Sequence, residues 1–76
     1  MKYIEELKPG EAFIYDKDIY LLTSDFKRSG DRLAINIKDG SVRWFSLSGM
    51  VDQTDLYILE DSNFSPVNPR LKNDTY

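Results

Sequence analysis

The fold is decided by one stretch that is typical of a complete β-hairpin, RLAINIKDGSVRWF at residues 32–45. Apolar side chains at positions 33, 35 and 37 alternate with polar or small ones, which is the period of a half-buried strand. Asp39-Gly40 follows, a dipeptide that favours the type I′ turn because both central residues of that turn need a positive φ. The stretch therefore predicts two antiparallel strands joined by a two-residue loop.

That loop fixes the pairing of the two strands and therefore the side chains that share a face. It places Ile37 opposite Val42 and Ile35 opposite Trp44, so that these four apolar residues lie together. We expect this face, Trp44 included, to form the core. The opposite face mixes cations, an amide and an aromatic ring, as a recognition surface requires: Arg32, Ala34, Asn36, Arg43 and Phe45.

Upstream of this hairpin, residues 11–15 and 19–23 predict two further strands, joined by the polar tip Asp16-Lys17-Asp18. A three-residue loop would place the aromatic residues of the first strand on the same face as Ile19, whereas a two-residue loop would pair the strands differently. The sequence leaves both registers open. Both faces of these strands are apolar, so either both are covered or one is a contact surface.

The two ends of the chain have a different character. Residues 1–7 predict one helical turn with Ile4 and Leu7 on the same side, ended by a Pro-Gly pair. A last strand is expected over residues 55–59. Residues 61–76 contain two prolines and several charges, so we expect a polar tail that is partly extended or disordered. Two of its apolar side chains could dock on the domain: Phe64 and Val67.

These elements predict one small β domain, residues 1–60, followed by the polar tail. Short strands spaced about 8–12 residues apart, with no long helix, favour a mainly all-β fold of about five strands. The architecture expected is a small SH3-like barrel or a curled antiparallel meander, with a short N-terminal turn.

The composition of the 76 residues argues against most enzymes. Without Cys or His there is no disulfide, thiolate zinc site, catalytic triad or imidazole metal ligand. No glycine-rich phosphate loop occurs. Asp16 and Asp18 could chelate a cation, but turn preference already explains them. We therefore predict a non-enzymatic protein without catalytic residues, metal or cofactor.

No apolar run approaches the roughly 20 residues that cross a bilayer, and the charged N-terminus is unlike a signal peptide. We expect a cytoplasmic protein with no membrane partner.

The charge is unevenly distributed along the chain. The whole chain has a net charge of −3, yet residues 25–43 carry five basic side chains against three aspartates. Guanidinium groups in this segment could bind a phosphate, and Phe26 and Phe45 could stack on a base. An acidic protein more often uses such a strand as a solvated face. Binding of nucleic acid or of a nucleotide-type anionic ligand is therefore kept as the alternative.

Five tyrosines in so short a chain favour a protein interface, where Tyr buries its ring and keeps a polar tip. The residues expected to bind a ligand or partner combine both signals: Arg28, Arg32, Asn36, Arg43, Phe45 and Tyr20.

One resemblance covers residues 7–59 and rests on turns and strands. The chain resembles small proteins common in tailed-phage genomes in three places. These are LKPGEAF at residues 7–13 with Tyr15 and Tyr20, AIN at residues 34–36 followed by Asp39-Gly40, and the Arg-Trp-Phe run. The likeness implies a phage accessory protein with a small β-barrel and transfers no catalytic residue.

The function we expect is therefore binding to a host protein, with modulation or inhibition of that protein in the host cytoplasm. The alternatives are the nucleic-acid or nucleotide binder and a minor virion or assembly component. A homodimer is compatible with each.

Overall fold

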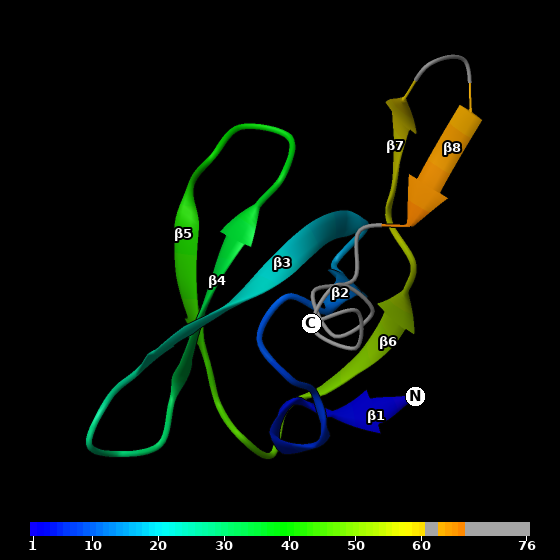
Figure 1. Ribbon diagram of the computed structural model, residues 1–76. Helices are drawn as coiled ribbons and strands as arrows, with labels where there is room; N and C mark the ends of the chain where they lie inside the picture. The colour runs from blue at the N-terminus through cyan, green and yellow to red at the C-terminus, as the bar shows by residue number, and fades with distance from the viewer. Residues whose placement is uncertain (61–62, 67–76) are drawn as a thin grey trace, which may run out of the picture.

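The computed structural model describes residues 1–60 and 63–66, which are almost entirely β-structure (Figure 1). Six antiparallel strands form one open sheet in the order β1-β6-β2-β3-β4-β5. Their bounds are β1 Lys2–Tyr3, β2 Ala12–Tyr15, β3 Asp18–Phe26, β4 Arg32–Asn36, β5 Val42–Phe45 and β6 Met50–Thr54. The expectation of a mainly all-β fold is confirmed, in the form of an open sheet.

The rest of the described chain is one short helix and one further hairpin. The 3-10 helix η1 (Ile4–Glu6) confirms the predicted N-terminal turn. Strands β7 (Tyr57–Glu60) and β8 (Asn63–Pro66) pair in a separate two-stranded sheet, which stands apart in Figure 1. No helix in the described part of the chain has the length or apolar character needed to cross a membrane.

Strands β6 and β8, one in each sheet, were missing from the sequence-based prediction. Strand β6, which follows the Ser48-Gly49 turn, pairs with β1 on one side and with β2 on the other. Its sequence, MVDQT, lacks the density of β-branched and aromatic residues that marks a strand, so its pairing partners determine it. Strand β8 falls within the segment expected to be a tail, and the predicted docking residue Val67 lies outside the described residues.

The register of the first hairpin is the two-residue alternative. Tyr15 pairs with Asp18 and Phe13 with Tyr20, so Asp16 and Lys17 form the turn. Their φ angles are +50° and +70°, as a type I′ turn requires. The turn therefore forms without the glycine that usually supplies such angles.

In the second hairpin the predicted type I′ turn is wrong. Ile35 pairs with Val42 and Leu33 with Trp44, a shift of two residues from the expected register. The wider loop is closed by the Asn36 N–H, which donates to the Ser41 carbonyl at 2.7 Å. Of the central Asp39-Gly40 pair, only Gly40 has a positive φ, +78°.

Hydrogen bonds from side chains explain why the wider loop forms in place of the two-residue turn. The Lys38 N–H donates to Asn36 Oδ1 at 2.8 Å, and the Ser41 N–H donates to Asp39 Oδ1 at 2.9 Å. These local bonds satisfy backbone donors that a two-residue turn would satisfy through the strand ladder. Because the shift is two residues, the same side chains still share each face.

The two faces of this hairpin are nevertheless the reverse of the prediction. Phe45, Ala34 and Asn36 are buried, whereas Trp44 and Val42 are exposed. Alternation separates two faces but does not say which one meets the rest of the sheet. Here the neighbouring strands present their aromatic residues on the Phe45 side, and that side becomes the core.

The core is a cluster of aromatic rings closed at one end by η1. Phe45 makes edge contacts with three rings, those of Phe13, Tyr15 and Tyr20, at centroid distances of 5.1–5.3 Å. Such edge-to-face pairs contribute beyond the area they bury. Aliphatic side chains complete the cluster: Ile4, Leu7, Leu22, Ala34 and Val51. Two backbone bonds, from Ile4 to Gly49 and from Glu5 to Leu47, hold η1 against the segment after β5.

Candidate functional site

The predicted recognition face points into the molecule. Phe45 is only 6% exposed, and Tyr20 and Asn36 are equally enclosed. The Asn36 side chain accepts the Lys38 N–H and so serves the β4–β5 loop. The expectation that this face meets solvent is therefore wrong, because it forms one wall of the aromatic core.

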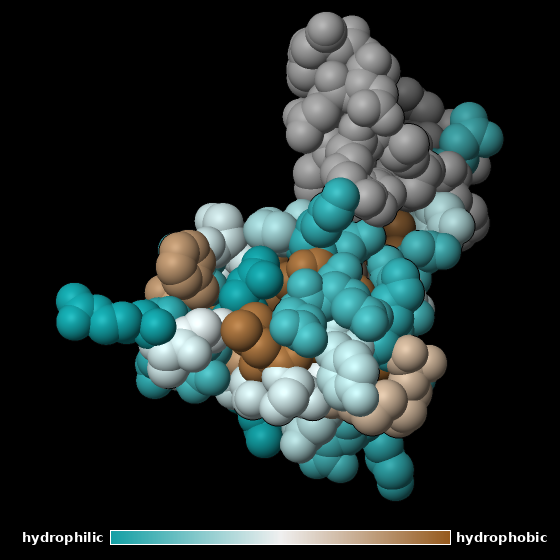
Figure 2. All heavy atoms as spheres, turned by 90° about the horizontal axis from the view of Figure 1, so that it is seen from below, coloured by the Kyte–Doolittle hydropathy of each residue, from teal (hydrophilic) through white to brown (hydrophobic). Residues whose placement is uncertain are grey.

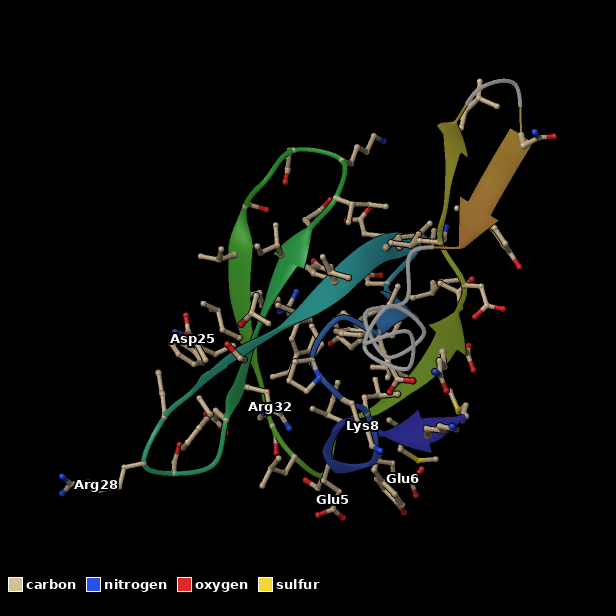
Figure 3. All side chains as sticks on the ribbon, viewed as in Figure 1. Glu5, Glu6, Lys8, Asp25, Arg28 and Arg32 are labelled. Carbon is tan, nitrogen blue, oxygen red and sulfur yellow. The ribbon has the colours of Figure 1, made fainter. Side chains whose placement is uncertain are left out.

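The three predicted arginines lie in different places. Arg43 stacks its guanidinium over the rings of Tyr15 and Phe45, at 4.8 and 5.5 Å from their centroids, and covers the edge of the core. Arg32 pairs with Phe45 across the strands, and its Nε is buried without a hydrogen-bond partner among the described residues. Arg28 extends from the β3–β4 loop into solvent, well away from Arg32 (Figure 3). The fold thus does not bring the three cations together.

The opposite side of the sheet, here called the outer face, is apolar across four strands. Its row of paired positions runs from Leu21 through Ile35 to Val42, and Leu33 lies beside Trp44 in the next row. On β2 to β5 and at the position after β4, the large apolar side chains of this face are Ile14, Ile19, Leu21, Leu33, Ile35, Ile37, Val42 and Trp44.

Several of these side chains are open to solvent. The exposed fraction is 59% for Val42, 46% for Ile37, 40% for Trp44 and 38% for Ile14. Single exposed apolar residues are ordinary, but contiguous ones mark an interaction surface. The end of the molecule seen from below has a different surface, because hydrophilic side chains dominate it and hydrophobic ones form a central group and a few separate spots toward the sides (Figure 2).

Lysines border the outer face at both of its ends. Lys27 places its Nζ 4.7 Å from the centroid of the Trp44 ring, a cation–π contact. At the other end, the two hairpin tips form an open cleft of about 330 Å³ lined by Lys17, Asp18, Ile19, Ile37 and Lys38.

The cleft joins charge to the apolar surface. The Ile37 N–H donates to the Ile19 carbonyl at 3.0 Å and fixes the two tips side by side. Two isoleucines form the apolar lining, and neither lysine pairs with a carboxylate in the described part of the chain. The lining carries two lysines against one carboxylate, that of Asp18, so an acidic group bound beside an apolar one would match it.

One titratable group near the cleft has a shifted pKa. The Ser41 hydroxyl donates to Asp39 Oδ1 at 2.7 Å, and this bond, together with the Ser41 N–H, holds the pKa of the exposed Asp39 carboxyl below its ordinary value of 3.8. Within the described residues, no cluster of three or more potential metal ligands is found. Asp16 occupies a turn position, as turn preference predicts, whereas Asp18 is the first residue of β3.

Comparisons with protein-family models, with curated proteins and with solved structures find no match for this chain. The resemblance to phage accessory proteins stays a prediction from the sequence.

The residues that the sequence analysis expected in the core are thus the ones that form the candidate binding surface. One signal in the sequence could have identified the core face. With a two-residue first turn, Phe13, Tyr15 and Tyr20 fall on one side of the sheet, and only Phe45 adds a fourth ring to them.

Proposed function

We propose that this protein is a non-enzymatic binding domain whose outer face binds a partner protein. The observation that carries the proposal is the contiguous apolar surface of four strands with Trp44 exposed on it. Its partner would present an apolar surface flanked by carboxylates, because lysines border the outer face at both ends.

The composition of the outer face fits this role. Tryptophan is enriched among the few residues that dominate binding energy, especially where less energetic contacts surround it and exclude water. Trp44 has such surroundings in Val42 and Leu33. The lysine ammonium groups would contribute mainly to the rate of association and to orientation.

The setting we propose follows from the resemblance stated above. In a phage-infected cell the partner would be a host protein, and occupation of its surface would modulate or inhibit it in the host cytoplasm. Binding of this kind needs shape and a few strong contacts but no active site. We further propose the SH3-like barrel as the parent architecture, supported by the backbone bonds that join η1 to the Leu47–Gly49 segment.

Capture of the host partner by the immobilised protein tests the proposal, when the wild type is compared with variants of its surface. Immobilised wild-type protein and Arg28→Ala should retain the same host protein, whereas Trp44→Ala and the double charge reversal Lys17→Glu/Lys38→Glu should lose it. Arg28 is the control because its exposed side chain lies in the β3–β4 loop, away from the outer face. Equal capture by wild type and Trp44→Ala would overturn the proposal.

Salt separates this function from the nucleic-acid or nucleotide alternative. A phosphate ligand would be released steeply as salt rises, whereas apolar contacts would retain the partner. Binding of an oligonucleotide or cyclic nucleotide that Arg28→Ala weakens and Trp44→Ala leaves unchanged would favour the alternative.

A further inference from the structure

The two edges of the six-stranded sheet are unequally protected. Strand β1 is two residues long and carries Lys2, and short charged edges resist pairing with other chains. Strand β5 is four residues long, VRWF, and contains neither proline nor a bulge. Its one charge, Arg43, lies over the rings of its own core. Within residues 1–60 and 63–66, strand β5 is therefore the edge that is open to another strand.

The peptide groups of two β5 residues point away from β4. In an antiparallel ladder, the residues whose N–H and C=O face the partner strand alternate with residues whose groups face outward. The Asn36 N–H bonds to the Ser41 carbonyl, and Arg43 and Phe45 continue that inward series. The N–H and C=O groups of Val42 and Trp44 consequently face outward, and no described residue pairs with them.

We propose that β5 pairs antiparallel with β5 of a second copy of this chain, about a two-fold axis through Trp44. Charge decides the position of the axis. An axis through Arg43 would set two guanidinium groups directly opposite each other, which disfavours pairing. An axis through Trp44 sets each Arg43 opposite Phe45 of the second copy, and Val42 opposite Ser46.

The Trp44 axis also suits the outward-facing groups. The two Trp44 residues then exchange both backbone hydrogen bonds, and their indoles meet on the outer face as a cross-strand aromatic pair. The two outer faces become one continuous apolar surface that stays open. The dimer is thus independent of the partner-binding proposal, and either can fail without the other.

Sedimentation equilibrium over a range of concentrations tests the dimer. The wild-type mass should rise from 8.9 kDa toward twice that value. Val42→Pro removes an outward N–H without removing a bond to β4, so it should raise the dimer Kd by about tenfold or more. Val42→Thr keeps the donor and the branched shape, and its dimer should match the wild type. A monomer at every concentration overturns the proposal.

Single cysteines test the register by a second route that does not need the proline variant to fold. The chain has no cysteine, so each substitution introduces one thiol. Trp44→Cys should form a disulfide-linked dimer readily, because directly opposed residues have Cα atoms about 5.5 Å apart. Arg43→Cys should cross-link much more slowly. The reverse order, or a Val42→Pro chain that folds and dimerises as well as wild type, overturns the proposal.

Discussion

The two hairpins of the large sheet reach the same antiparallel pairing through opposite turn chemistry. The β2–β3 hairpin turns on Asp16-Lys17, with both residues at positive φ and no glycine. The β4–β5 hairpin contains an Asp-Gly pair that suits such a turn, yet it uses a wider loop in which only the glycine has a positive φ. Local turn preference is therefore outweighed in both hairpins.

Besides the local hydrogen bonds of the second loop, the packing of rings across the sheet outweighs turn preference. The tight first turn sets Phe13 opposite Tyr20, and the second hairpin brings Phe45 within 5.1 Å of both. Burying an aromatic side chain is worth more than the fraction of a kilocalorie per mole that separates one loop from another.

The largest expected loss of stability concerns the side of the second hairpin that packs against the core. Phe45→Ala should destabilise the protein by about 3–5 kcal/mol, because it removes the ring at the centre of the core. Trp44→Ala, on the outer face, should cost about 1 kcal/mol or less. Chemical denaturation of both variants measures the difference.

A domain this small has little stability to lose, so Phe45→Ala could leave it unfolded at room temperature. Phe45→Leu then provides a milder variant that should still cost more than Trp44→Ala. A larger loss from Trp44→Ala than from either Phe45 variant would contradict the fold.

Sequence reasoning found most strands of the large sheet because their apolar alternation is strong. It placed β2, β4, β5 and residues 19–23 of β3 in strands and grouped the two faces of the second hairpin correctly. It did not find β6, whose polar sequence becomes a strand only between β1 and β2. Pairing partners far away in the chain are not visible in a local pattern.

The candidate site was harder to predict for a related reason. A face with Ile35, Val42 and Trp44 satisfies every sequence criterion for a core, and a face with Asn36 and Arg43 satisfies those for a surface. The deciding contacts join Phe45 to rings on other strands. Of the predicted site residues, Arg28 and Arg43 remain exposed, and Arg43 covers the core edge.

The next largest loss of stability is expected at the glycine of the second loop. Gly40→Val should cost about 1–2 kcal/mol, since a β-branched residue is strained at a φ of +78°. Nothing lies within 4 Å of the added Cβ, so the cost comes from the backbone alone. Gly40→Asn should recover most of it, because Asn tolerates this conformation. Thermal melts compare the two, and equal losses would contradict a backbone origin.

The first turn should respond in the opposite direction. Lys17→Gly places glycine at a φ of +70° and creates the Asp-Gly pair that type I′ turns favour, so stability should rise by about 0.5–1 kcal/mol. Lys17→Ala is the control, because it removes the charge and keeps the strain. A Lys17→Gly chain no more stable than Lys17→Ala would show that the turn is relaxed as it stands.

The smallest effect concerns the carboxylate that helps to shape the wider second loop. Hydrogen bonds from the Ser41 hydroxyl and the Ser41 N–H lower the pKa of Asp39 below 3.8, so the folded state favours its ionised form. This contribution to stability is present above the ordinary pKa and is lost as the pH falls through the lowered one. Carboxyl chemical shifts titrated by NMR should give a midpoint below 3.8 in the wild type. In Ser41→Ala the midpoint should move part of the way back, because the backbone donor remains, while the fold and the β4–β5 register stay unchanged. An Asp39 midpoint at the ordinary value in the wild type would mean that the Asp39–Ser41 bonds do not hold the wider loop in solution.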